Sequence, residues 1–143
     1  MSAQLFDTRT VRWRTLEIIP YLHYRILAID PENRIIDVLF KFAAGRQIVL
    51  HRHKVLNHTF VIAGEHWLYK ADGAVKEIRA TGSYIISPAS DEPHREGGGA
   101  DADAIVLFSI RGNGALYEIL DDDLNAIGEL SMRDFIDLYN AQP

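Results

Sequence analysis

Apolar and polar residues alternate along this chain in short runs, and turn-forming residues separate the runs at intervals of about ten residues. Runs of this length, rich in β-branched and aromatic residues, predict β-strands, and their regular spacing is typical of an all-β sandwich or barrel. Asp72-Gly73 and Asn113-Gly114 supply the residue types that tight turns need. The predicted strands cover residues 22–29, 34–42, 47–53, 58–62, 66–70, 75–79, 83–87, 104–111 and 115–120.

Two segments depart from this alternating pattern. Residues 95–103, REGGGADAD, are small, glycine-rich and mildly acidic, and they predict a mobile loop. Ser131 and Asp134 have the spacing of a capping box, and the apolar residues that follow recur at helical intervals. We therefore expect one short C-terminal helix that packs on a sheet. Because no linker, repeat or low-complexity segment divides the chain, we expect a single domain over residues 1–143.

Composition supports a globular protein and narrows its chemistry. The chain is 48% hydrophobic and 24% charged, which is typical of a domain that buries a core. Its net charge of −5, with no basic run, argues against nucleic acid or an anionic membrane as a partner. We find no signal peptide and no apolar run that could span a membrane, so we expect a cytoplasmic protein. The absence of cysteine excludes thiolate ligands and disulfides and leaves the six histidines as the main candidate ligands.

Two of these histidines lie two positions apart in a predicted strand. Side chains at this spacing leave the same face of a strand, and in a regular strand their Cα atoms lie about 6.6 to 6.8 Å apart. His51 and His53 can therefore converge on one metal ion. Such a pair alone holds an ion weakly, so a third ligand must come from another strand, and His58 and His94 are the candidates.

The residues around these histidines resemble the two-motif signature of the cupin superfamily, which consists of small jelly-roll barrels. The first motif reads G-x5-H-x-H-x4-H-x5-G over residues 45–64, and the second reads G-x5-P over residues 82–88, followed by His94. The resemblance implies an all-β cupin jelly roll with metal motifs at residues 45–94 and with His51, His53 and His94 as ligands. His58 stands where the family usually has glutamate. We therefore expect no carboxylate ligand, and we expect His58 to lie beside the metal or to be a fourth ligand.

Among cupins, the sequence is similar to the small dioxygenases that cleave acetylacetone and 2,4′-dihydroxyacetophenone, which use three histidines on non-haem Fe(II). The similarity extends to residues 13–19, 24–31 and 38–45. It implies an enzyme that uses O2 to break a carbon–carbon bond in a β-dicarbonyl or a hydroxyketone. We expect Fe(II) as the metal, and because imidazole also binds zinc and nickel, either ion can occupy the site in the purified protein. Two alternatives remain open: a non-catalytic small-molecule-binding or regulatory metal cupin, and a metal-dependent isomerase.

The strand pattern also suggests residues for a substrate pocket. Gln47 shares its face with the pair of histidines, and Phe60 and Ile62 share theirs with His58, so these three are the pocket candidates.

Other segments carry weaker expectations. The loop predicted at residues 95–103 leaves the barrel directly after His94 and is a candidate lid. His23 and His66 lie outside the motifs and are interpreted as ordinary surface or core histidines. The strands before Gly45 present sheet edges, so we expect a homodimer.

Overall fold

The computed structural model describes residues 7–143, which form strands throughout and a helix at the C-terminal end. The elements are β1 (Arg14–Leu16), β2 (Ile19–Asp30), β3 (Ile35–Phe42), β4 (His51–His53), β5 (Leu56–Ala63), β6 (His66–Lys70), β7 (Val75–Arg79), β8 (Tyr84–Ser87), β9 (His94–Gly97), β10 (Ala104–Arg111), β11 (Ala115–Leu120), β12 (Ala126–Ser131) and α1 (Met132–Ala141).

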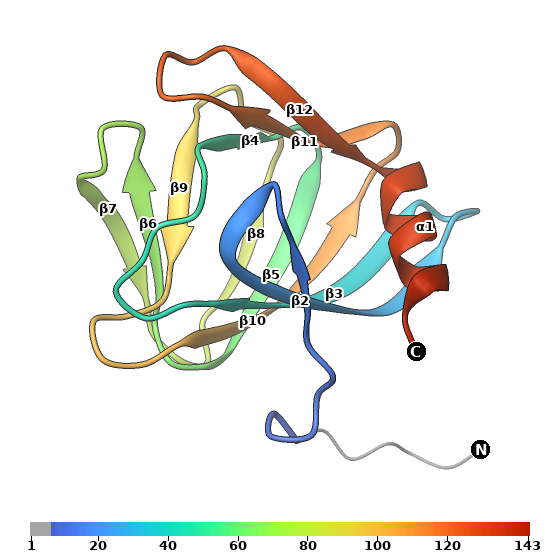
Figure 1. Ribbon diagram of the computed structural model, residues 1–143, viewed down its shortest axis with the longest axis horizontal. Coiled ribbons are helices and arrows are strands. Elements are labelled where there is room, and N and C mark those ends of the chain that lie inside the picture. Colours follow the sequence, from blue (N-terminus) through green and yellow to red (C-terminus); the bar gives the residue numbers. More distant parts are fainter. Residues whose placement is uncertain (1–6) are drawn as a thin grey trace.

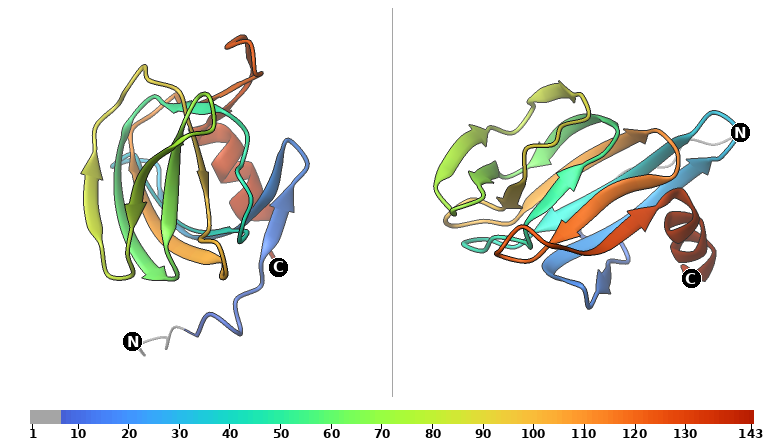
Figure 2. Two further views of the ribbon diagram at one scale, coloured as in Figure 1. Left: turned by 90° about the vertical axis from the view of Figure 1, so that its left-hand side faces the viewer. Right: turned by 90° about the horizontal axis from the view of Figure 1, so that it is seen from above.

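The strands of the described residues form two antiparallel sheets that face each other (Figures 1 and 2). One sheet has the order β1-β2-β3-β10-β5-β8, and the other has the order β12-β11-β4-β9-β6-β7. In both sheets, consecutive strands such as β2 and β3 lie next to strands from distant parts of the sequence, such as β10 beside β3 and β11 beside β4, as in a jelly roll. This arrangement confirms the all-β fold with a short C-terminal helix that the sequence predicts.

The core lies between the sheets because the central strands alternate inward apolar and outward residues. Val38 on β3 and Val106 and Ile110 on β10 are fully buried. Phe40 packs edge-on against Phe108, with ring centroids 4.9 Å apart. These side chains form the apolar core between the two sheets.

Helix α1 lies against β2 and β12 at one end of the barrel (Figure 1). The predicted capping box is present: the Ser131 hydroxyl accepts a hydrogen bond from the Asp134 backbone N–H at 3.1 Å, and the Asp134 carboxylate accepts one from the Ser131 N–H at 2.8 Å. Phe135 of the helix is only 2% exposed and belongs to the core. The described part of the chain contains no helix with the length and hydrophobicity needed to cross a membrane.

The prediction of a mobile loop at residues 95–103 is wrong for the first half of this segment. Residues up to Gly97 belong to strand β9, and Gly98 and Gly99 after it are buried. The glycines allow close backbone packing, because a Cβ on Gly97 would overlap the Arg46 carbonyl oxygen, and one on Gly98 would lie 2.6 Å from the Phe42 carbonyl oxygen. Residues 95–99 are therefore part of the barrel wall and do not form a lid.

Candidate metal centre

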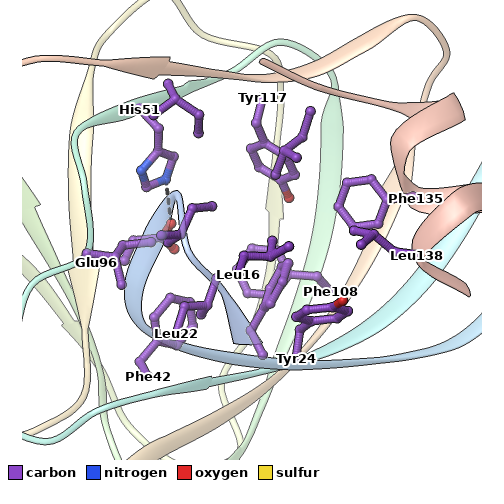
Figure 3. Close-up of a pocket in the computed structure, with 15 residues that line it drawn as sticks. Leu16, Leu22, Tyr24, Phe42, His51, Glu96, Phe108, Tyr117, Phe135 and Leu138 are labelled. Atoms are coloured by element: carbon purple, nitrogen blue, oxygen red, sulfur yellow. Dashed lines mark hydrogen bonds and ion pairs between the residues drawn. The ribbon is translucent and has the colours of Figure 1, made fainter. Parts of the chain in front are cut away.

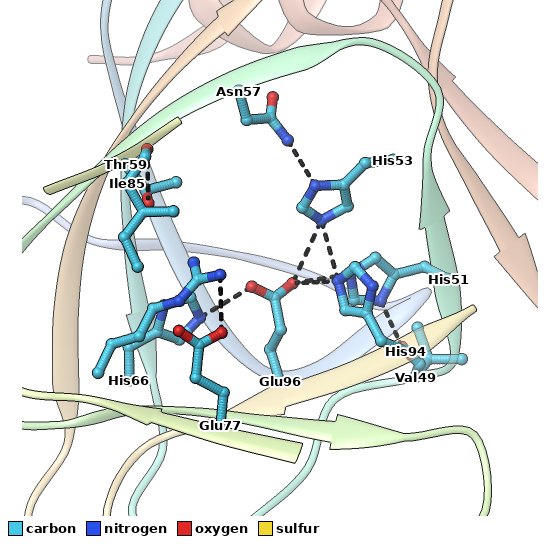
Figure 4. A network of polar contacts seen from close by, with 11 residues as sticks. Val49, His51, His53, Asn57, Thr59, His66, Glu77, Ile85, His94 and Glu96 are labelled. Atoms are coloured by element: carbon cyan, nitrogen blue, oxygen red, sulfur yellow. Dashed lines mark hydrogen bonds and ion pairs between the residues drawn. The ribbon is translucent and has the colours of Figure 1, made fainter. Parts of the chain in front are cut away.

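Strands β4 and β9 are neighbours in one sheet and carry the candidate ligands. Their register places His51 opposite His94, so both side chains leave the same face. His53 and Glu96 follow two positions along their strands and share that inward face. One donor atom from each of these four residues lies within 4.8 Å of the others. Figure 4 shows the imidazole rings and the carboxylate pointing toward one another.

Glu96 is the residue that sequence reasoning missed. Its Oε2 lies 2.7 Å from Nε2 of His51, and the corresponding nitrogens of His94 and His53 lie 3.5 and 3.6 Å away. The expectation of a site without a carboxylate is therefore wrong. The signal was present, because Glu96 stands two positions after His94 just as His53 follows His51. It was missed because the glycine-rich segment was interpreted as a loop, where residue parity has no meaning.

The electrostatics of the cluster favour a bound cation. Burial favours the protonated form of Glu96, but its side-chain contacts with His51, His53, His66 and His94 outweigh it and hold the pKa of this carboxyl well below its ordinary value. Burial lowers the pKa of His53 to about 4 and also lowers the pKa of His94. Glu96 is therefore an ionised carboxylate beside the neutral imidazoles of His53 and His94. Neutral imidazoles and ionised carboxylates are also the forms that bind divalent metals.

The hydrogen-bonding groups around His51 provide a second test of whether a metal fits. Its Nδ1 lies 2.8 Å from the Val49 carbonyl oxygen, which can only accept a hydrogen bond, so Nδ1 carries the proton. In the neutral ring, Nε2 is then an acceptor, yet it lies 2.7 Å from the carboxylate of Glu96, which is also an acceptor. A second proton on the ring or a cation between the two atoms removes this conflict. A ring held through Nδ1 by a backbone carbonyl is also the usual orientation of a metal-ligating histidine.

Two buried side chains hold the ligands in place from outside the cluster. Nδ1 of His53 lies 2.7 Å from the side-chain amide of Asn57. Nε2 of His66 lies 2.8 Å from Oε1 of Glu96, and Nδ1 of His66 has no partner among the described residues, so the proton sits on Nε2 and is donated to the carboxylate. His66 is a core histidine, as interpreted from the sequence, but its contact with a candidate ligand was not foreseen.

His58 does not reach this cluster, so the expectation that it lies beside the metal is wrong. Along β5, Asn57 and Thr59 are buried, whereas His58 between them faces outward. Its Nδ1 lies 2.6 Å from the Tyr84 hydroxyl on the neighbouring edge strand β8. Asn57 takes the inward position beside His53, one residue earlier than predicted.

The predicted substrate-pocket residues also lie away from the cluster. Gln47 is exposed and donates a hydrogen bond to the Gly73 carbonyl oxygen at 3.3 Å. Phe60 is 42% exposed because it shares the outward face of His58, and Ile62 is only half-buried. None of the three lines the two cavities that reach the cluster.

These two cavities differ in size and polarity. One, of about 30 Å³, is lined by apolar side chains of the core together with His51, Glu96 and Tyr117 (Figure 3). The other, of about 120 Å³, is bordered by His53, His94 and Glu96 and by polar residues of β7 and of the segment around Pro88. The cluster is therefore reached by an apolar and a polar cavity.

A barrel of two antiparallel sheets with this buried cluster has the cupin fold that the sequence resemblance predicted. No model of a protein family and no curated protein sequence matches the chain. Similarity to this chain is found among solved structures, whose folds are alike although their sequence identity to it is low.

Three such structures illustrate the similarity. An RmlC-like cupin protein from Ralstonia eutropha JMP134 has a TM-score of 0.73 and 23% identity, covering 98% of this chain and 86% of that one. The acetylacetone dioxygenase from Acinetobacter johnsonii has a TM-score of 0.74 and 12% identity, covering 100% and 95%. The polyketide cyclase RemF from Streptomyces resistomycificus has a TM-score of 0.61 and 16% identity, covering 91% and 85%. At these identities the comparisons establish the fold, and the activity must be argued from the site.

Proposed function

We propose that this protein is an Fe(II)-dependent dioxygenase that cleaves a carbon–carbon bond in a β-dicarbonyl or a hydroxyketone. The observation that carries the proposal is the buried set of three histidines and one carboxylate, reached by a polar and an apolar cavity. Structural similarity to an acetylacetone dioxygenase supports it.

His51, His53, His94 and Glu96 would hold the metal. When bound, the metal supplies Lewis-acid activation and a template for a chelating dicarbonyl. Glu96 balances part of the metal's charge, while Asn57 and the Val49 carbonyl fix the ring orientations of His53 and His51. No side-chain nucleophile is needed.

The two cavities suit two small-molecule partners. The polar cavity of about 120 Å³ admits an organic substrate beside His53 and His94. The apolar cavity of about 30 Å³ exceeds the roughly 10–15 Å³ that one water-sized molecule needs, and its apolar walls suit O2. Both oxygen atoms of O2 enter the products of the cleavage, so no further electron donor is required.

The test begins with metal content. The purified protein is expected to bind one divalent ion per chain, and His51→Ala and His94→Ala are expected to lose it. His58→Ala is the matched control, because this histidine faces outward, and it is expected to retain the metal. Retention of a full complement of metal by both cluster variants would overturn the metal centre.

The second stage tests the reaction. The Fe(II)-loaded protein is expected to consume O2 in the presence of acetylacetone or a hydroxyacetophenone, with one O2 taken up per substrate cleaved. Stoichiometric metal with no oxygen uptake on any dicarbonyl or hydroxyketone would reject the dioxygenase and would favour a binding cupin or an isomerase.

A further inference from the structure

We propose that Arg79 binds an anionic group of the substrate in the polar cavity, so that the substrate is a short-chain oxo acid. This inference rests on the proposed function and names the substrate class for the same site.

The position of Arg79 in the sheet directs its side chain into the barrel. Arg79 is the last residue of β7 and pairs with His66 on β6. Directly opposite residues in an antiparallel pair point to the same face, and His66 points inward to Glu96. In agreement, only 10% of the Arg79 side chain is exposed.

Arg79 has hydrogen-bonding capacity that the described residues leave unused. Its Nη2 donates to Oε2 of Glu77 at 3.2 Å, whereas its Nε is buried and has no partner in the described part of the chain. A guanidinium has only donors, and buried donors of charged groups are normally satisfied. Because Arg79 lines the polar cavity, a molecule that enters this cavity can supply the missing acceptor.

Charged side chains of both signs line the cavity. Lys76 and Arg79 pair with Glu92 and Glu77, and these two carboxylates also line it. The side chain of Glu77 is 44% exposed and that of Glu92 is 60% exposed, so both pairs are open to solvent, whereas the buried Nε of Arg79 has no acceptor among the described residues. Glu96 at the inner end belongs to the cluster that would hold the metal. A guanidinium matches the geometry of a carboxylate and binds it through charge-assisted hydrogen bonds.

The size of the cavity limits the substrate. Its volume of about 120 Å³ is of the same order as the 150 Å³ cavity that binds benzene. A short aliphatic oxo acid is therefore within the size that the cavity can hold. With its carbonyl oxygens near His53 and His94 and a carboxylate at Arg79, the substrate is a small 2,4-dioxo acid or a related oxo acid.

The test compares two ligands that differ in charge but have the same chain, 2,4-dioxopentanoate and its methyl ester. Binding to the zinc-loaded protein is measured by calorimetry, which does not depend on turnover. We expect the acid to bind at least about tenfold more tightly than the ester, the size expected of a hydrogen bond to a charged group. Arg79→Gln is expected to abolish this preference, and Arg79→Lys, which keeps the charge, to retain part of it.

Arg133→Gln is the matched control, because Arg133 is an exposed helix residue whose side chain is 79% exposed, and it is expected to keep the full preference. Equal binding of acid and ester to the unmodified protein would overturn the proposal, as would an unchanged preference in folded Arg79→Gln. If Arg79→Gln does not fold, a reduced preference in Arg79→Lys still supports a role for the guanidinium, and an undiminished preference opposes it.

The experiments distinguish a failure of the dioxygenase proposal from a failure of the anion-site proposal. An Arg79-dependent preference for the acid without O2 uptake by the Fe(II)-loaded protein would reject the dioxygenase and leave the anion site. O2 uptake with both compounds, together with equal binding of acid and ester, would reject the anion site and leave the dioxygenase.

Discussion

Replacing the glycines after Glu96 with alanine distinguishes a wall strand from a mobile loop. A Cβ on Gly98 would lie 2.6 Å from the Phe42 carbonyl oxygen, whereas ordinary carbon–oxygen contacts are about 3.3 Å, so one backbone must move by about 0.7 Å. On Gly97 the overlap, with the Arg46 carbonyl oxygen, is more severe. On Gly99 the nearest atoms are side-chain atoms of Glu65 and Trp67 at 3.3 and 3.5 Å, which can shift.

The expected cost follows from these contacts. Overpacking of this kind typically costs about 1–3 kcal/mol, against which the gain from replacing glycine is about 0.4–1 kcal/mol. We expect Gly97→Ala to destabilise most, Gly98→Ala next, and Gly99→Ala to lie within about 0.5 kcal/mol of the unmodified protein. After this gain is subtracted, about 1–2.6 kcal/mol remain for overlaps with backbone atoms this close, and at roughly 2–4 °C per kcal/mol the first two lower Tm by roughly 2–10 °C.

Calorimetry or urea unfolding of the metal-free proteins measures these differences, and metal analysis of the same variants as purified provides a second readout. Because Gly97 follows Glu96 directly, its displacement is expected to reduce metal content as well. If Gly97→Ala and Gly98→Ala both unfold within about 1 °C of the unmodified protein, a shift that corresponds to less than 1 kcal/mol, the segment is a loop and our account of the wall is refuted.

Four further predictions concern the cluster, the helix and the assembly. Glu96→Gln keeps the shape of the side chain but removes its charge. Metal affinity, measured by chelator competition, should fall by at least about 10-fold, which is the smallest loss typical of residues that only support the ligands. An unchanged Kd would contradict the role of Glu96 as a ligand. Asn57→Ala should weaken metal binding by about 10–100-fold because the ring of His53 loses its support, whereas an effect no larger than that of His58→Ala would show that the contact is unimportant. Phe135→Ala should cost about 3–5 kcal/mol in urea unfolding, because the ring is 2% exposed, and a loss below 1 kcal/mol would place the helix outside the core. Light scattering should give twice the mass of one chain if the predicted homodimer forms, and the mass of one chain would reject it.

Much of the fold follows from short-range patterns in the sequence. The bounds of β10 and β11 agree with the predicted strands because alternating apolar residues and flanking turns mark both ends. That His51 and His53 share one face follows from the two-residue period of a strand alone, and the helix cap at Ser131 follows from local sequence spacing alone.

The missed features depend on what lies across the barrel. A shift of one residue reverses the face of every side chain in a strand, so the choice between Asn57 and His58 required the start of β5, which the sequence does not mark. The glycines after Glu96 look flexible in isolation, and only the backbone packed against them shows that they are needed for close contact. His66 approaches Glu96 because β6 pairs with β9, a long-range pairing with no local signal.

The contact of His66 with Glu96 also bears on which ions the protein accepts. Since His66 occupies Oε1, the carboxylate offers the cluster a single oxygen, Oε2, and its orientation is set when the chain folds. Binding a metal then requires little ordering of this side chain. Calcium prefers six to eight oxygen ligands and often takes both oxygens of a carboxylate, and magnesium also prefers oxygen. A nitrogen-rich set with one fixed oxygen therefore selects transition metals over the far more abundant alkaline-earth ions.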